Sequence, residues 1–121
     1  MSVRLTKNVD YILVEFSTGM DYWELIQGIT KLFLMPEFKN QNDIWVFASG
    51  QIKMAHTDLY KIKSLVRKYC PKDFKATKTA MVVQNDFQKT YATLYSDICK
   101  DLQHEISIFT DLKSAKDWII A

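Results

Sequence analysis

The chain has 121 residues, of which 48% are hydrophobic and 25% charged, and its net charge is +2. This length and composition are typical of one globular domain that buries a core of its own, and they argue against a disordered or fibrous chain. Three Gly and two Pro exclude long flexible linkers.

The sequence shows neither a targeting signal nor the cysteine spacing of a disulfide framework. No apolar run approaches the roughly 20 residues that a membrane-spanning helix needs, and residues 1–7 lack the apolar region of a signal peptide. Cys70 and Cys99 fall in separate helix-like segments, which is typical of buried thiols in a reducing compartment. We therefore expect a cytoplasmic protein.

The first third of the chain predicts a β-hairpin followed by a helix. Residues 3–6 and 11–17 are rich in strand formers and are separated by turn residues. Asp21 is a suitable N-cap for a helix that ends before Pro36. Gly28 lies inside this helix, where it indicates close packing on a neighbour. The apolar positions recur at helical spacing: Leu25, Ile26, Ile29, Leu32 and Phe33.

The middle of the chain predicts a second strand and a second helix. Residues 44–48 are bulky and apolar, as expected of an interior strand, and residues 49–55 show no regular pattern. Thr57 or Asp58 can cap a helix through Tyr69, which Pro71 stops. The inward positions of this helix are Leu59, Ile62, Leu65, Val66 and Tyr69.

Residues 80–83, Ala-Met-Val-Val, form the strand around which the other elements can be arranged. A strand without a polar face is covered on both sides, so we expect it in the middle of the sheet. Asp86 then caps a helix to about residue 102. A strand at 105–109 follows, and Thr110 or Asp111 caps a final helix, whose inward face is Leu112, Ala115, Trp118 and Ile119.

The order of these elements, β-β-α-β-α-β-α-β-α, predicts an α/β fold. Strands that alternate with helices form a mainly parallel sheet, here a mixed one with an N-terminal antiparallel hairpin and four helices. Local signatures agree with one known family: Phe16-Ser17-Thr18-Gly19, Met35-Pro36-Glu37-Phe38, Ala80-Met81-Val82-Val83, and Phe109-Thr110-Asp111 with Ala115 and Trp118-Ile119. The chain resembles the STAS-like proteins, the fold of the anti-sigma-factor antagonists, and in particular their small uncharacterised SpoIIAA-like bacterial branch. The resemblance implies a single STAS-like domain over residues 1–121.

The resemblance fails at the phosphorylation site of the anti-sigma-factor antagonists. Those proteins are similar to one another in carrying a phosphorylatable Ser in an Asp-Ser-Ser-Gly-like turn before a helix. The matching loop here contains Ser49-Gly50 and His56-Thr57-Asp58 but no such turn. A phosphorylation switch is therefore not carried over to Ser49 or Thr57.

No catalytic, metal or cofactor motif stands out. His56 and His104 lack a second ligand at metal-binding spacing, so surface or capping roles are the better interpretation. Phosphate-binding glycine motifs and a nucleophile elbow are absent, and capping explains Asp21, Asp86 and Asp111. We expect no enzyme activity, no cofactor and no metal. The larger aromatic residues suit the core or an interface better than base stacking: Trp23, Trp45, Trp118, Phe87, Tyr91 and Tyr95.

A binding site is expected where the parallel strands end. In open α/β sheets, ligands bind beyond the carboxyl ends of the strands, where helix N-termini also present free N–H groups. The alternative is that these are ordinary loop residues. The polar residues predicted at this edge are Ser49, Gln51, His56, Thr57 and Asn85.

The leading functional hypothesis is a non-enzymatic regulatory or protein-interaction module. It would bind a partner protein through the strand-end loops and the helix at 57–69. Residues 53–78 carry eight basic and two acidic side chains, which favours an acidic partner. The alternative is a carrier or sensor of a lipid or small apolar ligand, suggested by the apolar helix at 23–35, the five Met and the fold's similarity to lipid-transfer domains. Nucleic-acid binding is weaker still, and a homodimer remains possible.

Overall fold

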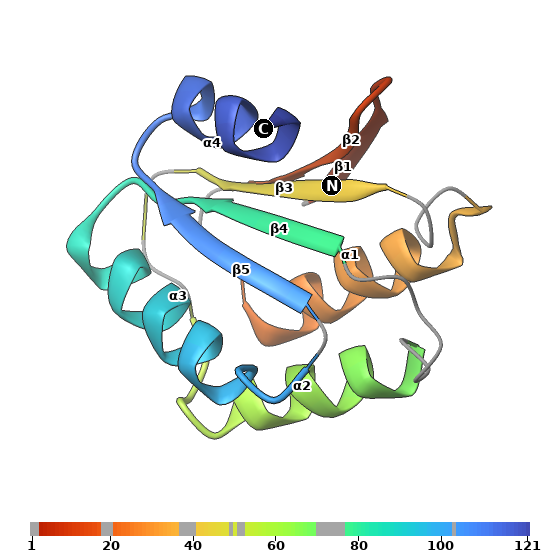
Figure 1. The fold of residues 1–121 in the computed structure, drawn as a ribbon. Coiled ribbons are helices and arrows are strands. Elements are labelled where there is room, and N and C mark those ends of the chain that lie inside the picture. The colour runs from red at the N-terminus through yellow and green to blue at the C-terminus, as the bar shows by residue number, and fades with distance from the viewer. Residues whose placement is uncertain are drawn as a thin grey trace.

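The computed structural model describes residues 3–17, 21–36, 41–48, 50, 53–69, 77–102 and 104–121. One five-stranded sheet, in the order β1-β2-β3-β4-β5, has α1, α2 and α3 on one face and α4 on the other (Figure 1). The hairpin pair is antiparallel and the other three pairs are parallel, so the predicted fold class is confirmed. The elements are β1 Val3–Lys7, β2 Tyr11–Phe16, α1 Tyr22–Leu34, β3 Asn42–Phe47, α2 Asp58–Tyr69, β4 Thr77–Val82, α3 Asp86–Ile98, β5 His104–Phe109 and α4 Leu112–Ile120.

Two apolar clusters hold the layers together. The larger fills the space between the sheet and α1–α3, where the Phe16 ring stacks on Phe47 with centroids 5.1 Å apart. The smaller lies under α4 and contains Ile44, Ala80 and Val82 of the sheet. Side chains alternate between the faces of a strand, so β4 contributes to both clusters. β4 is covered on both faces, as predicted, but it is the fourth strand, and β3 is the middle one.

Gly28 allows α1 to lie close against the hairpin. A Cβ at this position would come within 2.8 Å of Val3 Cγ1 and 3.0 Å of Phe16 Cε1. Real Cβ atoms do not approach that closely, so a larger residue would force the helix away from β1 and β2. The close packing predicted at this glycine is confirmed, as is the N-cap at Asp21, whose carboxylate accepts a hydrogen bond from Glu24 N (2.9 Å).

The predicted cap of α3 is wrong by one residue. Asn85 has an extended backbone and its side-chain oxygen accepts a hydrogen bond from Gln88 N (2.8 Å), so Asn85 is the N-cap and Asp86 lies in the first turn. The helix ends at Ile98 rather than near residue 102. Asp111 caps α4, as one of the two predicted choices.

The tryptophans and cysteines fall in different environments. Trp45 is buried, and Trp118 is half-buried in the smaller cluster under α4. Trp23 is 70% exposed, so of the two places predicted for it, the core and an interface, the core is excluded. Cys99 is a buried free thiol, as predicted, while Cys70 lies outside the described residues. None of the described helices is both long and apolar enough to cross a bilayer.

Candidate functional site

Three of the five residues predicted at the carboxyl end of the parallel strands lie among the described residues. His56 and Thr57 are exposed just before α2, and Asn85 is exposed at the start of α3, whereas Ser49 and Gln51 lie outside the described residues. The side-chain amide of Asn85 donates a hydrogen bond to Gly50 O (3.2 Å). The structure therefore brings Asn85 to the loop after β3, but in a structural contact.

Gln88 is the residue at this edge that sequence reasoning missed. Its side chain is buried, and its Nε2 donates to Ala48 O (2.6 Å) and Gly50 O (2.9 Å) while its Oε1 accepts from Gln84 N (2.8 Å). These bonds join the exit of β3 to the exit of β4. A signal was present, because Gln88 is the polar member of the inward stripe that continues through Tyr91, Ala92, Tyr95 and Cys99.

The clamp formed by Asn85 and Gln88 uses the polar groups of this edge internally. Gly50 accepts from both side chains and has a φ of 119°, a conformation that glycine adopts without strain. Polar groups that already bind one another are not available to orient a ligand. Among the described residues, Asn85 and Gln88 therefore form a structural junction at the strand ends, and a binding role for this edge stays a prediction.

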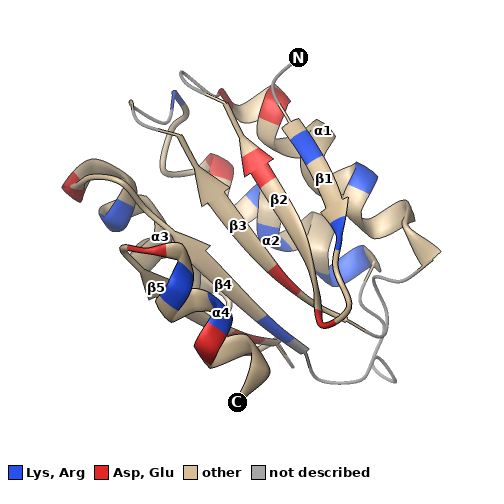
Figure 2. Ribbon diagram, turned by 90° about the horizontal axis from the view of Figure 1, so that it is seen from above, with Lys and Arg blue, Asp and Glu red and all other residues tan. Residues whose placement is uncertain are grey.

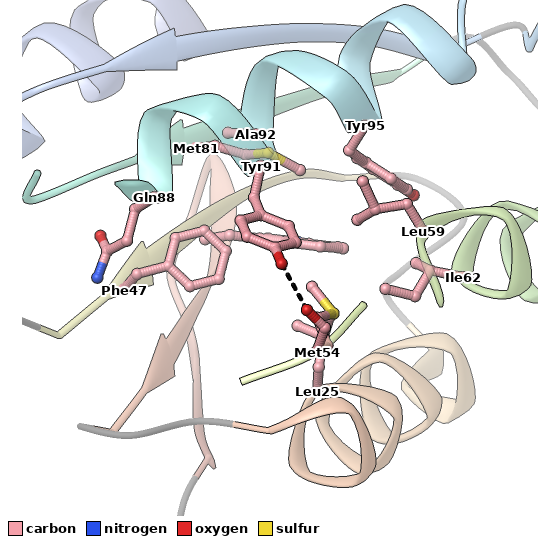
Figure 3. A pocket seen from close by; sticks show the side chains of 11 residues that line it. Leu25, Phe47, Met54, Leu59, Ile62, Met81, Gln88, Tyr91, Ala92 and Tyr95 are labelled. Atoms are coloured by element: carbon pink, nitrogen blue, oxygen red, sulfur yellow. Dashed lines mark hydrogen bonds between the residues drawn. The ribbon is translucent and has the colours of Figure 1, made fainter. Parts of the chain in front are cut away.

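A small apolar cavity lies behind this clamp, between the sheet and the three helices (Figure 3). Its volume is about 30 Å³, and Leu25, Trp45, Leu59 and Tyr91 contribute to its walls. The Tyr91 hydroxyl donates a hydrogen bond to the Met54 carbonyl oxygen, which fastens the loop before α2 to α3 (Figure 3). Pockets for organic ligands typically measure about 300–1,000 Å³, so this space is too small for a lipid chain.

A larger groove opens on the outer surface between α2 and α3. Its volume is about 400 Å³, and its lining consists of His56, Leu59, Tyr60, Leu94, Asp97 and Ile98. Leu59 is buried at the floor and separates the groove from the cavity, whereas the Tyr60 side chain on the rim is 61% exposed. Of the predicted site residues, the groove contains His56, whose ring meets Tyr91 edge-on at 5.1 Å.

The helix on one side of this groove is basic. α2 carries four basic residues and one acidic residue, which recur along the helix behind the sheet (Figure 2). Lys63 and Arg67 both pair with Asp101 beyond α3, at 2.7 and 3.0 Å, and the hydrogen bond from Lys63 holds the pKa of the Asp101 carboxyl below its usual range. One carboxylate thus faces two cations, so positive charge remains on this side.

Comparisons with known proteins identify the fold. No protein-family model matches the chain, and no curated protein does. Among solved structures, it is similar to the crystal structure of an uncharacterized protein of the DUF3478 family from Shewanella loihica PV-4, described as having a SpoIIAA-like fold. The TM-score is 0.62 at 16% identity, and the match covers 98% of this chain and 92% of that one. The chain has a SpoIIAA-like fold.

The SpoIIAA-like domain contains a second polar cluster that the sequence did not predict. His104, expected at the surface, is half-buried at the start of β5, with its Nε2 against the Thr79 hydroxyl. Burial lowers the pKa of this imidazole to about 4. The surface role predicted for His104 is wrong, because the strand register carries it under the helices, whereas His56 is exposed as expected. No group of three potential metal ligands gathers among the described residues.

Proposed function

We propose that this SpoIIAA-like domain is a non-enzymatic interaction module of the cytoplasm that binds an acidic amphipathic helix of a partner protein in the groove between α2 and α3. The observation that carries the proposal is the groove itself, about 400 Å³ in volume, beside a basic helix. Helix-in-groove recognition is a common mode by which small domains bind their partners.

The lining of the groove suits the apolar face of a helix. Leu59, Leu94 and Ile98 provide aliphatic surface from two helices, and Tyr60 stands exposed at the rim. Exposed tyrosines at the edge of an apolar depression are frequent binding hot spots, because they bury much area at little conformational cost. We therefore expect Tyr60 to contribute most to affinity.

The charge of α2 supports an acidic partner. Lys68 is exposed near the ring of Tyr69. The two positive charges of Lys63 and Arg67 outnumber the single negative charge of Asp101, with which both pair. Opposite charges across an interface raise the association rate and fix the orientation of the partner. We expect binding to weaken as salt is raised, because charges at an exposed rim are screened.

Photo-crosslinking tests the proposal directly. A photoreactive phenylalanine at Tyr60 should capture a partner in a lysate of the source cells, whereas the same group at Ile120, on the opposite face and 62% exposed, should not. Acidic segments should then be found in the crosslinked peptide. Equal crosslinking at both positions, or a crosslink to a second copy of this chain, would replace the proposal with non-specific contact or with a homodimer.

The charge component is tested separately with matched substitutions. Lys68→Glu on α2 should weaken binding of the captured partner, whereas Lys113→Glu on α4 should not, because Lys113 lies on the opposite face. Both side chains are exposed, so the folded domain should tolerate each change. Equal loss in the two variants would mean that only the net charge matters.

The carrier of a small apolar ligand remains a second candidate because the cavity behind Leu59 is apolar. Its volume of about 30 Å³ requires side chains to move before a ligand of useful size enters. Native mass spectrometry of the purified protein tests this. A bound lipid that is lost in Leu59→Trp, which adds bulk at the residue that lines both the groove and the cavity, would support the carrier.

A further inference from the structure

Two stripes of side chains run side by side along α3 with the spacing of an interhelical contact. In each stripe, successive members are four, three and four residues apart, the spacing at which one helix packs along another. The first stripe is buried and consists of Gln88, Ala92, Tyr95 and, just past the helix end, Cys99. The second lies one residue earlier, about 100° around the helix, and consists of Phe87, Tyr91, Leu94 and Ile98. α3 therefore has a second packing face beside the one that the core uses.

The second stripe is only partly covered by the domain itself. Tyr91, in its middle, is buried, and its hydroxyl donates to the Met54 carbonyl oxygen of the loop before α2. Leu94 and Ile98 are half-buried and line the groove between α2 and α3. Phe87, at the other end, is 42% exposed. The apolar surface of α3 therefore extends beyond the groove, toward the start of the helix.

Ring contacts connect Phe87 to the groove. The Phe87 and Tyr91 rings have centroids 5.2 Å apart, and the Tyr91 and His56 rings meet edge-on at 5.1 Å. His56 lines the groove. Phe87, Tyr91 and His56 thus form one continuous aromatic group that begins in the groove and ends at the start of α3. A partner helix that lies in the groove and follows α3 meets Phe87 next.

The charges around the stripe restrict how a partner helix can be turned about its own axis. The stripe itself is uncharged, as the centre of an interface usually is. Thr90, exposed beside it, has its hydroxyl bonded to Asp86 O (3.0 Å) within the helix. α3 carries two acidic residues, Asp86 and Asp97, and one basic residue, Lys89, all exposed, whereas α2 across the groove is basic. Acidic residues of a partner are therefore favoured on the side that faces α2.

We infer that the partner helix of the proposed function lies along α3 from Ile98 to Phe87 and is recognised by a motif about three turns long. The inference rests on that proposed function and extends its site beyond the groove. Ile98 and Phe87 are eleven residues apart, which is about 16 Å of helix at about 1.5 Å per residue. The partner segment therefore has at least about 12 residues, with apolar side chains at spacings of about three and four residues toward α3 and acidic side chains toward α2.

Photo-crosslinking at two positions measures the extent of this interface. A photoreactive phenylalanine at Phe87 should capture the same protein as one at Tyr60. Tyr60 shares the groove with residues that are seven and eleven positions from Phe87, so the two crosslinked residues of the partner should lie in one helical segment, about seven to eleven residues apart. The control position is Lys89, which is exposed on the opposite side of α3 and should give no crosslink to that segment.

Each outcome of the crosslinking decides one question. Capture at Tyr60 but not at Phe87, or equal capture at Phe87 and Lys89, would refute the inference while the proposed function stands. Crosslinks from Phe87 to a second copy of this chain, or to a different segment of the partner, would refute it as well. Capture at neither Tyr60 nor Phe87 would remove the proposed function and the inference with it.

Substitution of Phe87 tests the same contact independently. Phe87→Ala should weaken binding of the protein captured at Tyr60 about tenfold, as loss of an aromatic anchor does, whereas Phe87→Tyr keeps the ring and should bind as the wild type does. Trp23→Ala is the control, because Trp23 is also an exposed aromatic residue at the second position of its helix, but its ring packs on Tyr22 of α1. Equal affinity of Phe87→Ala and Trp23→Ala would overturn the inference. Urea unfolding shows whether each variant is folded, and the crosslinking decides the question even if Phe87→Ala is not.

Discussion

Asp43 and His104 together should make the stability of the domain insensitive to pH over a range in which either group alone would make it depend on pH. In the unfolded chain at pH 5, Asp43 is ionised and His104 is protonated, since their ordinary pKa values are 3.8 and 6.5. In the folded domain at the same pH, Asp43 carries a proton, because burial raises its pKa to about 7, and His104 is neutral. Folding then moves one proton between the residues without net uptake, so the linked slope of stability with pH cancels.

Removing either group should expose the slope of the other, with opposite signs. In Asp43→Asn, only the unfolded state binds the His104 proton between about pH 4 and 6.5, so the free energy of unfolding should rise with pH. In His104→Gln, only the folded state binds the Asp43 proton between pH 3.8 and about 7, so stability should fall as pH rises. Burial is the main cause of both shifts, so each shift survives loss of the partner.

The magnitude follows from the size of the shifts. One pKa unit corresponds to about 1.4 kcal/mol, so over the full range stability should change by about 3 kcal/mol in Asp43→Asn, from the His104 shift, and by about 4 kcal/mol in His104→Gln, from the Asp43 shift. Urea unfolding at several pH values between 4 and 7, followed by tryptophan fluorescence, measures this against the wild-type protein, which cancels the other titrating groups. Parallel pH profiles for the two variants, or slopes of the reverse signs, would refute the reasoning.

Three further substitutions test the packing, the clamp and the proposed site. Gly28→Ala should lower the free energy of unfolding by about 1–2 kcal/mol, because a Cβ 2.8 Å from Val3 overpacks the contact by more than the helix gains; equal or higher stability in urea would contradict this. Gln88→Ala should cost about 2–3 kcal/mol and speed amide exchange at the strand ends, since Ala48 O loses its side-chain donor, Gly50 O loses one of its two, and Gln84 N loses its acceptor; unchanged exchange would exclude the clamp. Tyr60→Ala should leave stability within about 0.5 kcal/mol but weaken partner binding about tenfold or more, whereas Ile120→Ala should change neither; titration of each variant with the captured partner measures this.

Local chemistry accounts for the parts of the fold that the sequence could predict. These parts depend on signals that act over only a few residues. They are the turn between the first two strands, the cap at Asp21 and the end of the helix before Pro36. Gly28 could be interpreted because glycine lowers the stability of a helix, so its presence there indicates that close packing requires it. The order of strands and helices then restricted the sheet to a mainly parallel one.

Where adjacent residues had equal propensity, the sequence could not decide. Asn85 and Asp86 are both good N-caps. The extended backbone of Asn85 settles the choice, and the side chain of Asn85 also contacts Gly50, 35 residues earlier in the chain.

The polar contacts between strands were out of reach for a different reason. Thr79 meets Asp43 36 residues away and His104 25 residues away, and only the register of a parallel sheet brings the three together. Neither histidine carries a local signature that separates the buried one from the exposed one. Gln88 was within reach, because a polar residue in an otherwise apolar helical stripe predicts a buried hydrogen-bonding role.

The two polar clusters have a common mechanical consequence for the groove. The bond between Asp43 and Thr79 joins β3 to β4 near their amino ends, and Gln88 joins the same strands where they exit, with apolar residues between. α2 connects β3 to β4 and α3 follows β4, so the strands that carry the walls of the groove are fixed relative to each other at both ends. A groove whose walls are already positioned loses less entropy when a partner helix binds, which favours affinity without a large interface. Loss of the clamp in Gln88→Ala should therefore weaken partner binding even though Gln88 is outside the groove.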